Sequence, residues 1–125
     1  MLARANRLTH EADFKKLARQ GRPFYSGLIT VKIAKNNLEH SRFGVVVSAK
    51  VSKKAVERNL IKRRITEIFR LNLKNIKPGF DLMVLVKPGV LALDYDRLRT
   101  ELEKLLRKSN LAVANNDKKS NPKNN

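Results

Sequence analysis

The chain has 125 residues, of which 42% are hydrophobic, so it can form one compact domain but not two sizeable cores. Its 28 Lys and Arg residues against 11 Asp and Glu residues leave a net charge of +17, which favours a polyanionic partner, with nucleic acid ahead of an anionic membrane surface. The lack of cysteine excludes disulfides, thiolate nucleophiles and cysteine-ligated metals.

The first ten residues, MLARANRLTH, mix charged and apolar side chains and do not form the apolar core of a signal peptide. No apolar run approaches the roughly 18 residues that a membrane-spanning helix needs. The sequence therefore predicts a soluble cytoplasmic protein.

A first helix is predicted over about 10–20. Thr9 is expected to cap it, Glu11 and Asp13 lie in its first turn, where acidic side chains are favourable, and Gly21 is expected to end it in the left-handed conformation.

Two β-rich segments follow, at 28–34 and 42–49, and a polar loop joins them. This arrangement predicts an antiparallel hairpin. Segment 22–27 is ambiguous and can simply extend the first of the two strands.

The second half of the chain contains a helix, a strand and a helix. Segment 53–73 has helical periodicity, Pro78 and Gly79 end it, and the apolar run 80–86 is typical of a strand. Asp94 is expected to cap the last helix, whose apolar stripe consists of Leu98, Leu102, Leu105 and Leu106.

One α+β domain is therefore predicted over 1–108, followed by a basic tail at 109–125 that is too polar to order itself. The simplest packing of these elements is one sheet with the helices on one face.

The segment from Lys50 to Arg70 carries eight basic and two acidic side chains. On a helix, its buried face would contain Ile61, Ile65, Ile68 and Phe69. The opposite face would contain Asn59, Lys62, Arg63, Thr66 and Arg70. An ordinary solvated helix surface is the alternative interpretation, but such surfaces mix both signs of charge, whereas this stripe has no acid. The pattern favours polyanion binding.

The residue types on this stripe suit RNA. Lys and Arg side chains one helical turn apart can follow a row of phosphates, and Asn59 can hydrogen-bond a sugar or a base edge. Lys53 and Lys54 lie at the start of the helix, where its dipole also favours an anion.

Residues 49–70, AKVSKKAVERNLIKRRITEIFR, resemble the signature of the bacterial ribonuclease P protein component. The centre of that signature is formed by Arg58, Asn59, Lys62 and Arg63. The resemblance extends to RANRLTHEADFKKLARQG, FDLMVLVKPG and the closing leucine helix, and it covers about residues 4–108.

The resemblance implies an α-β-β-β-α-β-α sandwich similar to a domain of small-subunit ribosomal proteins. Its helices pack on one four-stranded sheet, and its basic helix lies in a left-handed β-α-β crossover. It also implies a partnership of one protein with one catalytic RNA. That RNA performs the cleavage of precursor tRNA with its own Mg²⁺, so we expect no catalytic residue and no metal site in the protein.

In the family, the basic helix faces the catalytic RNA, and a cleft between the first helix and the sheet receives the 5′ leader of precursor tRNA. Carried over to this chain, the residues expected to bind the catalytic RNA are Lys50, Lys53, Lys54, Arg58, Asn59, Lys62, Arg63 and Arg70. Those expected to bind the leader are Phe14, Lys15, Phe24 and Lys32.

The chain departs from the family pattern on both surfaces. Leu60 and Thr66 stand where the family often has arginine, and Arg64 adds a charge that relatives commonly lack. Ala18 and Lys32 stand where relatives can have aromatic residues, so we expect weaker stacking on the leader and stronger electrostatic attraction.

Three other functions remain as alternatives. A general RNA-binding or ribosome-associated protein of the same fold shares the charge pattern. A protein-only ribonuclease would have to use His10 and His40, or Asp94 and Asp96, although a helix cap and a first-turn charge explain this acid pair. Membrane-surface binding is disfavoured because the apolar helix face is committed to a sheet and the chain has no Trp.

Overall fold

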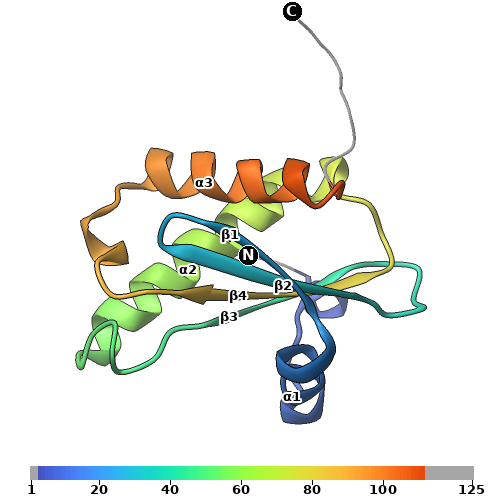
Figure 1. Cartoon of the computed structure of the whole chain (residues 1–125), viewed down its shortest axis with the longest axis horizontal. Coiled ribbons are helices and arrows are strands. Elements are labelled where there is room, and N and C mark those ends of the chain that lie inside the picture. The colour runs from blue at the N-terminus through green and yellow to red at the C-terminus, as the bar shows by residue number, and fades with distance from the viewer. Residues whose placement is uncertain (1–2, 112–125) are drawn as a thin grey trace, which may run out of the picture.

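The computed structural model describes residues 3–111, which form three α-helices and one four-stranded sheet (Figure 1). The elements, in chain order and apart from three short 3₁₀ turns, are α1 (Glu11–Gln20), β1 (Arg22–Ser26), β2 (Ile29–Lys35), β3 (Arg42–Val46), α2 (Ala55–Asn72), β4 (Phe80–Val86) and α3 (Tyr95–Lys108). No helix of this part of the chain is long and apolar enough to cross a membrane.

The strand order is β1-β2-β4-β3, and the expected hairpin of 28–34 with 42–49 is wrong. β4 lies between β2 and β3, antiparallel to β2 and parallel to β3. It is the most apolar strand, and Leu82, Met83 and Val84 are buried on its two faces, which suits an interior position. The tight hairpin is instead β1 with β2, where Gly27 has a φ of 54°.

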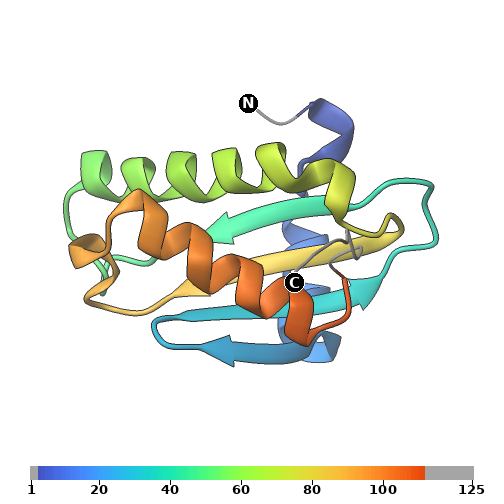
Figure 2. The same cartoon turned by 90° about the horizontal axis from the view of Figure 1, so that it is seen from above.

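The connection from β3 through α2 to β4 has the rare left hand. In Figure 2 the two strands run in the same direction, and α2 returns across the nearer face of the sheet beside β3. Right-handed crossovers are the strong default, so this hand follows from the family resemblance and not from general rules. The crossover leaves one side of α2 facing away from the sheet.

The helices lie on both faces of the sheet, which corrects the one-face expectation (Figure 1). α2 and α3 cover one face with the main core, which includes the predicted leucine stripe of α3. α1 lies on the opposite face over a small cluster around Leu8, Leu17 and Met83. A sheet with both faces covered explains why the interior strands are apolar on both sides.

The ends of α1 differ from the prediction. Its N-cap is His10 and not Thr9, and no side chain caps the helix, although Glu11 and Asp13 do lie in the first turn. Gly21 has a φ of −66°, which is not left-handed. A Cβ at Gly21 would lie 2.5 Å from the carbonyl oxygen of Leu17, so glycine is needed there for close backbone approach.

α3 begins and ends with well-formed caps. The Asp94 carboxylate accepts a hydrogen bond from the Arg97 N–H at 2.8 Å, as predicted. At the other end, Asn110 has a φ of 64° and the Leu111 N–H donates to the Leu106 carbonyl at 2.9 Å, which is a Schellman motif. Leu111 is buried, so the folded structure continues past Lys108. The rest of the predicted tail, 112–125, lies outside the described residues.

Glu101 connects α3 to the β1–β2 hairpin. Its buried carboxylate accepts a hydrogen bond from the Ser26 hydroxyl, and Arg97 and Lys104 lie within 3.4 Å and 3.7 Å of it. The Ser26 hydrogen bond is the main cause that lowers the pKa of Glu101 below its ordinary 4.5, and the nearby cations add to it against the desolvation.

Glu101→Gln should reduce the free energy of unfolding by about 2 kcal/mol at pH 7. A carboxyl whose pKa is lower in the folded state stabilises the protein above its unfolded pKa, and that stabilisation is lost as the pH falls through the folded pKa. The difference between wild type and variant should therefore shrink as the pH falls below 4.5, as urea unfolding can show. If the difference in unfolding free energy did not change with pH, the ionised Glu101 carboxylate would not be its cause.

Candidate RNA-binding surfaces

α2 separates its apolar and basic side chains onto two faces as predicted. Ile61, Ile65, Ile68 and Phe69 are each at most 1% exposed, and the ring of Phe69 stacks on Phe43 at 4.5 Å. Exposed side chains occupy the opposite face, and they belong to Asn59, Lys62, Arg63 and Arg70. Packing of the isoleucine face therefore fixes the direction in which the basic face points.

Two of these cations have no acidic partner in the part of the chain that the structure describes. Lys62 and Arg63 form no ion pair with any acid between residues 3 and 111. Both side chains are exposed to solvent, so their charge is available to an external anion.

Arg70 differs from the other members of the stripe because Glu67 engages it. Its Nε and Nη2 donate to the two carboxylate oxygens of Glu67 at 2.8 Å and 2.5 Å. These hydrogen bonds are the main cause that lowers the pKa of Glu67 to about 2. An RNA phosphate at Arg70 would compete with this carboxylate, so Arg70 offers less charge than its position in the sequence indicates.

The loop before α2 is held by Ser52. Its hydroxyl accepts from the Lys54 N–H at 3.1 Å and donates to the Glu57 carboxylate, and its carbonyl accepts from Arg58 Nη1 at 2.8 Å. Arg58 is therefore half-buried, and it helps to hold this loop. The sequence motif alone does not indicate this structural role. The loop leaves Lys50, Lys53 and Lys54 exposed beside the start of the helix.

Three of the four predicted leader contacts lie on the α1 side of the molecule. Phe14 lies over β3, so close that a Cβ on Gly44 would be 2.5 Å from its ring. Lys32 Nζ donates to the Ala18 carbonyl at 2.8 Å, which ties β2 to the end of α1. Lys15 is exposed and pairs with Glu11 at 3.4 Å.

Phe24, the fourth predicted contact, lies on the other face of the sheet, where it packs against the core under α3. Its neighbour Tyr25 points to the α1 side and is 58% exposed. The register joins Tyr25 to Thr30, Thr30 to Leu85 and Leu85 to Val46, which forms one row across all four strands. We call Phe14, Tyr25, Lys32 and Val46 the α1-side surface; Tyr25 and Val46 are the members that the sequence-based prediction did not include.

A compact ion-pair network lies beneath this surface. Arg42 Nε and Nη2 donate to the two oxygens of the buried Asp81 at 2.8 Å and 2.6 Å, and Nη1 is 3.4 Å from Asp13 of α1. The hydrogen bonds with Asp81 are the main cause that raises the pKa of the Arg42 guanidinium. The network joins α1 to the paired ends of β3 and β4.

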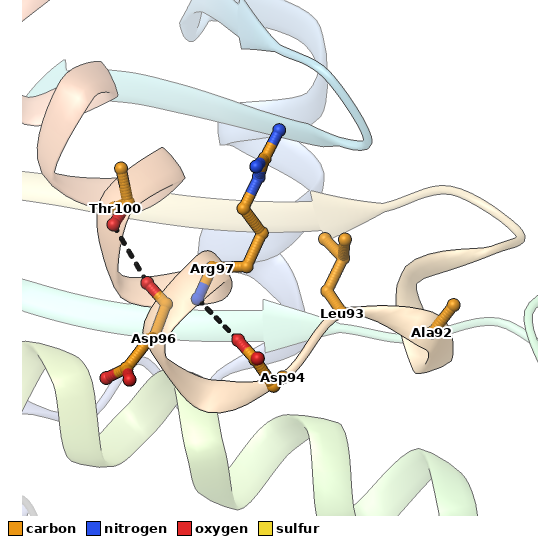
Figure 3. A pocket seen from close by; sticks show the side chains of 6 residues that line it. All are labelled: Ala92, Leu93, Asp94, Asp96, Arg97 and Thr100. Atoms are coloured by element: carbon orange, nitrogen blue, oxygen red, sulfur yellow. Dashed lines mark hydrogen bonds between the residues drawn. The ribbon is translucent and has the colours of Figure 1, made fainter.

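Asp94 and Asp96, two of the four residues considered for a protein-only nuclease, make other contacts in the structure. Asp94 caps α3, and Asp96 is 3.7 Å from Arg99; both line a shallow pocket at the start of the helix (Figure 3). Within residues 3–111, no group of three or more His, Asp or Glu side chains is arranged to hold a metal ion.

Asp94→Ala should lower the free energy of unfolding by about 1 kcal/mol, because the first turn of α3 loses its cap. Asp96→Ala serves as the control, since its carboxylate is exposed and contributes at most a few tenths of a kcal/mol. Urea unfolding of both variants measures the difference, and equal losses would contradict the capping role.

Comparisons with known proteins show which family the chain resembles. Residues 2–110 match the Ribonuclease P family model. The chain is 41% identical over 105 residues to the ribonuclease P protein component of Synechocystis sp., an alignment that covers 83% of this chain and 85% of that protein.

Solved structures give the same result. The ribonuclease P protein of Thermotoga maritima superposes with a TM-score of 0.75 at 33% identity, over 82% of this chain and 96% of that one. The Staphylococcus aureus protein superposes with a TM-score of 0.79 at 27% identity, over 87% and 99% of the two chains. Matched in both sequence and fold, the chain belongs to the ribonuclease P protein family.

Proposed function

We propose that this protein is the subunit of ribonuclease P that binds the catalytic RNA through the basic face of α2 and the 5′ leader of precursor tRNA through the α1-side surface. The observation that carries the proposal is that Lys62 and Arg63 pair with no acid of residues 3–111 and lie on a helix whose other face packs on the sheet. Cations held in this way can follow phosphates without giving up an internal ion pair.

The exposed cations around the start of α2 extend this surface. Lys50, Lys53 and Lys54 lie beside a helix N-terminus whose dipole attracts phosphate, and Asn59 adds a group that can contact a sugar or base. Arg58 supports the loop by donating to the Ser52 carbonyl. Arg70 binds a phosphate when that phosphate replaces the Glu67 carboxylate as its partner.

On the α1 side, the exposed ring of Tyr25 and the partly exposed ring of Phe14 can stack on leader bases. Lys15 and Lys32 supply nearby positive charge for the backbone. Neutralisation of phosphates by both surfaces would allow the RNA to accept its substrate at lower Mg²⁺. In this proposal one protein joins one RNA, the RNA and its Mg²⁺ perform the hydrolysis, and the protein contributes no catalytic group.

Reconstitution tests the proposal directly. Purified protein is added to a protein-free bacterial ribonuclease P RNA at near-physiological Mg²⁺, with precursor and mature tRNA supplied side by side. We expect faster precursor cleavage and tighter binding of precursor than of mature tRNA. No gain in cleavage would favour the general RNA-binding function instead.

A further inference from the structure

A concave site lies on the face of the sheet opposite the α1-side surface, near the last residues of α3. It is a cavity of about 310 Å³ between the beginning of β1, the end of β2, the beginning of β4 and residues 109–111. The residues that matter for its chemistry are Arg22, Phe24, Lys35, Lys77, Phe80 and Leu111. Its volume is at the lower end of the roughly 300–1,000 Å³ that is usual for small-ligand pockets.

The wall of this cavity is held by main-chain hydrogen bonds. The Schellman turn after α3 directs Leu111 into the core, and the Leu111 carbonyl accepts from the Lys77 N–H at 2.8 Å. Phe24 and Phe80 are half-buried and pack against the main core. The cavity is therefore part of the folded structure and does not require a rearrangement to form.

The lining combines aromatic rings with positive charge. The Arg22 guanidinium lies 5.4 Å from the centre of the Phe24 ring, and the side chains of Lys35 and Lys77 are exposed at the rim. No acidic residue among residues 3–111 lines the cavity. An apolar floor that includes π-faces, surrounded by three cations, matches the two parts of a nucleotide, because a base can stack and its phosphate can be neutralised.

We propose that this cavity binds one unpaired nucleotide of the precursor leader, upstream of the nucleotides that contact the α1-side surface. The inference rests on the proposed function, because it assumes that the leader reaches α1. A base inside a duplex cannot enter such a cavity, whereas a single-stranded leader can present one.

The path between the two sites is short in the fold. Arg22 directly follows Gly21 at the end of α1, and β1 is an edge strand of the sheet. Tyr25, on the α1 side, and Phe24, in the cavity, are consecutive residues of this strand. A leader that crosses Tyr25 can pass around the free edge of β1 and place its next bases at Arg22 and Phe24.

The chain's own C-terminal segment is the competing occupant, since it begins beside Leu111. Residues 112–125 contain three Lys and one Asp, so they carry the same sign of charge as the rim of the cavity. Charge complementarity therefore favours RNA over this segment.

The test uses the full-length protein assembled with the catalytic RNA. Lys35→Ala/Lys77→Ala removes two rim charges without touching the core, and Phe24→Leu removes a ring while keeping apolar volume. Lys74→Ala/Lys87→Ala is the charge-matched control, because both side chains are exposed and neither lines the cavity. Affinity is measured for precursor tRNAs whose leaders are shortened one nucleotide at a time from the 5′ end, and for mature tRNA.

We expect both cavity variants to lose about tenfold in affinity for the longest leader. The loss should disappear at a defined leader length, while mature tRNA and the control variant show none. A loss that does not depend on leader length overturns the inference, as does weaker binding of the catalytic RNA alone, which would make that RNA the occupant. Unchanged affinity also overturns it, and tighter leader binding after removal of 112–125 would identify that segment as the occupant.

Phe14→Ala separates this inference from the proposed function. If Phe14→Ala weakens leader binding and the cavity variants do not, only the cavity inference fails. If neither weakens it, leader binding on the α1 side fails as well.

Discussion

Lys62→Ala/Arg63→Ala should weaken binding of the catalytic RNA by about 20-fold near 0.15 M salt. Each phosphate contact contributes about 0.7–0.9 to the slope of log affinity against log salt, so loss of two contacts should flatten that slope by about 1.4–1.8. Neither side chain packs in the core or pairs with an acid within residues 3–111, so the folded structure should not change. Filter-binding titrations at several salt concentrations give both quantities.

The matched control removes the same charge elsewhere. Lys87→Ala/Arg107→Ala changes two exposed cations that lie after β4 and near the end of α3, away from the basic face of α2. A small loss with an almost unchanged slope is expected, because only the long-range field is affected. If this control flattens the slope as much as the α2 variant, the RNA responds to net charge and not to the α2 face.

Asp81→Ala should reduce the free energy of unfolding by about 3 kcal/mol, because it breaks a mostly buried ion pair. The carboxylate accepts two hydrogen bonds from Arg42 and one from Asn36, at 2.6–2.9 Å, and the Arg42 side chain is only 21% exposed. Its removal leaves a mostly buried guanidinium with only the longer contact to Asp13. Urea unfolding monitored by circular dichroism measures the loss.

Two further variants show whether the cause is an uncompensated charge. Arg42→Leu/Asp81→Leu should be less destabilising than Asp81→Ala alone, because neither charge is then left without its partner. Asp96→Ala, which removes an exposed acid, should cost at most a few tenths of a kcal/mol. If Asp81→Ala costs no more than Asp96→Ala, the network does not stabilise the fold.

Asp81→Ala also tests whether the Arg42–Asp81 network positions α1. Arg42 also approaches Asp13, so loss of its main anchor should loosen α1 against the sheet. We expect Asp81→Ala to weaken binding of long-leader precursor more than binding of the catalytic RNA, because α2 packs on the other face.

The elements that could be predicted from the sequence are those defined by a pattern within their own residues. The isoleucine spacing in 53–73 specified both faces of α2, since helical periodicity relates residues within one helix whatever lies around it. Asp94 and the leucine stripe specified α3, and the apolar run 80–86 specified β4 residue for residue. The motif around Arg58 and Asn59 indicated the family and therefore the RNA partner.

The tertiary structure decided which elements become neighbours. Alternation along a strand does not identify the strand beside it, so the position of β4 between β2 and β3 could not be derived from segments 28–34 and 42–49. Phe24 and Tyr25 point to opposite faces because they are consecutive in β1, and only the pairing of Phe24 with Val31 assigns Phe24 to the core and Tyr25 to the α1 side.

The tertiary structure also decided which side chains become partners. Asp81 and Arg42 are 39 residues apart in sequence and meet only because β3 and β4 pair in parallel register. The basic character of α2 was determined by its sequence alone, since charges on a helix surface need no partner to be exposed. Which of these cations remain unpaired was decided by the fold, because that depends on where acidic side chains lie in space.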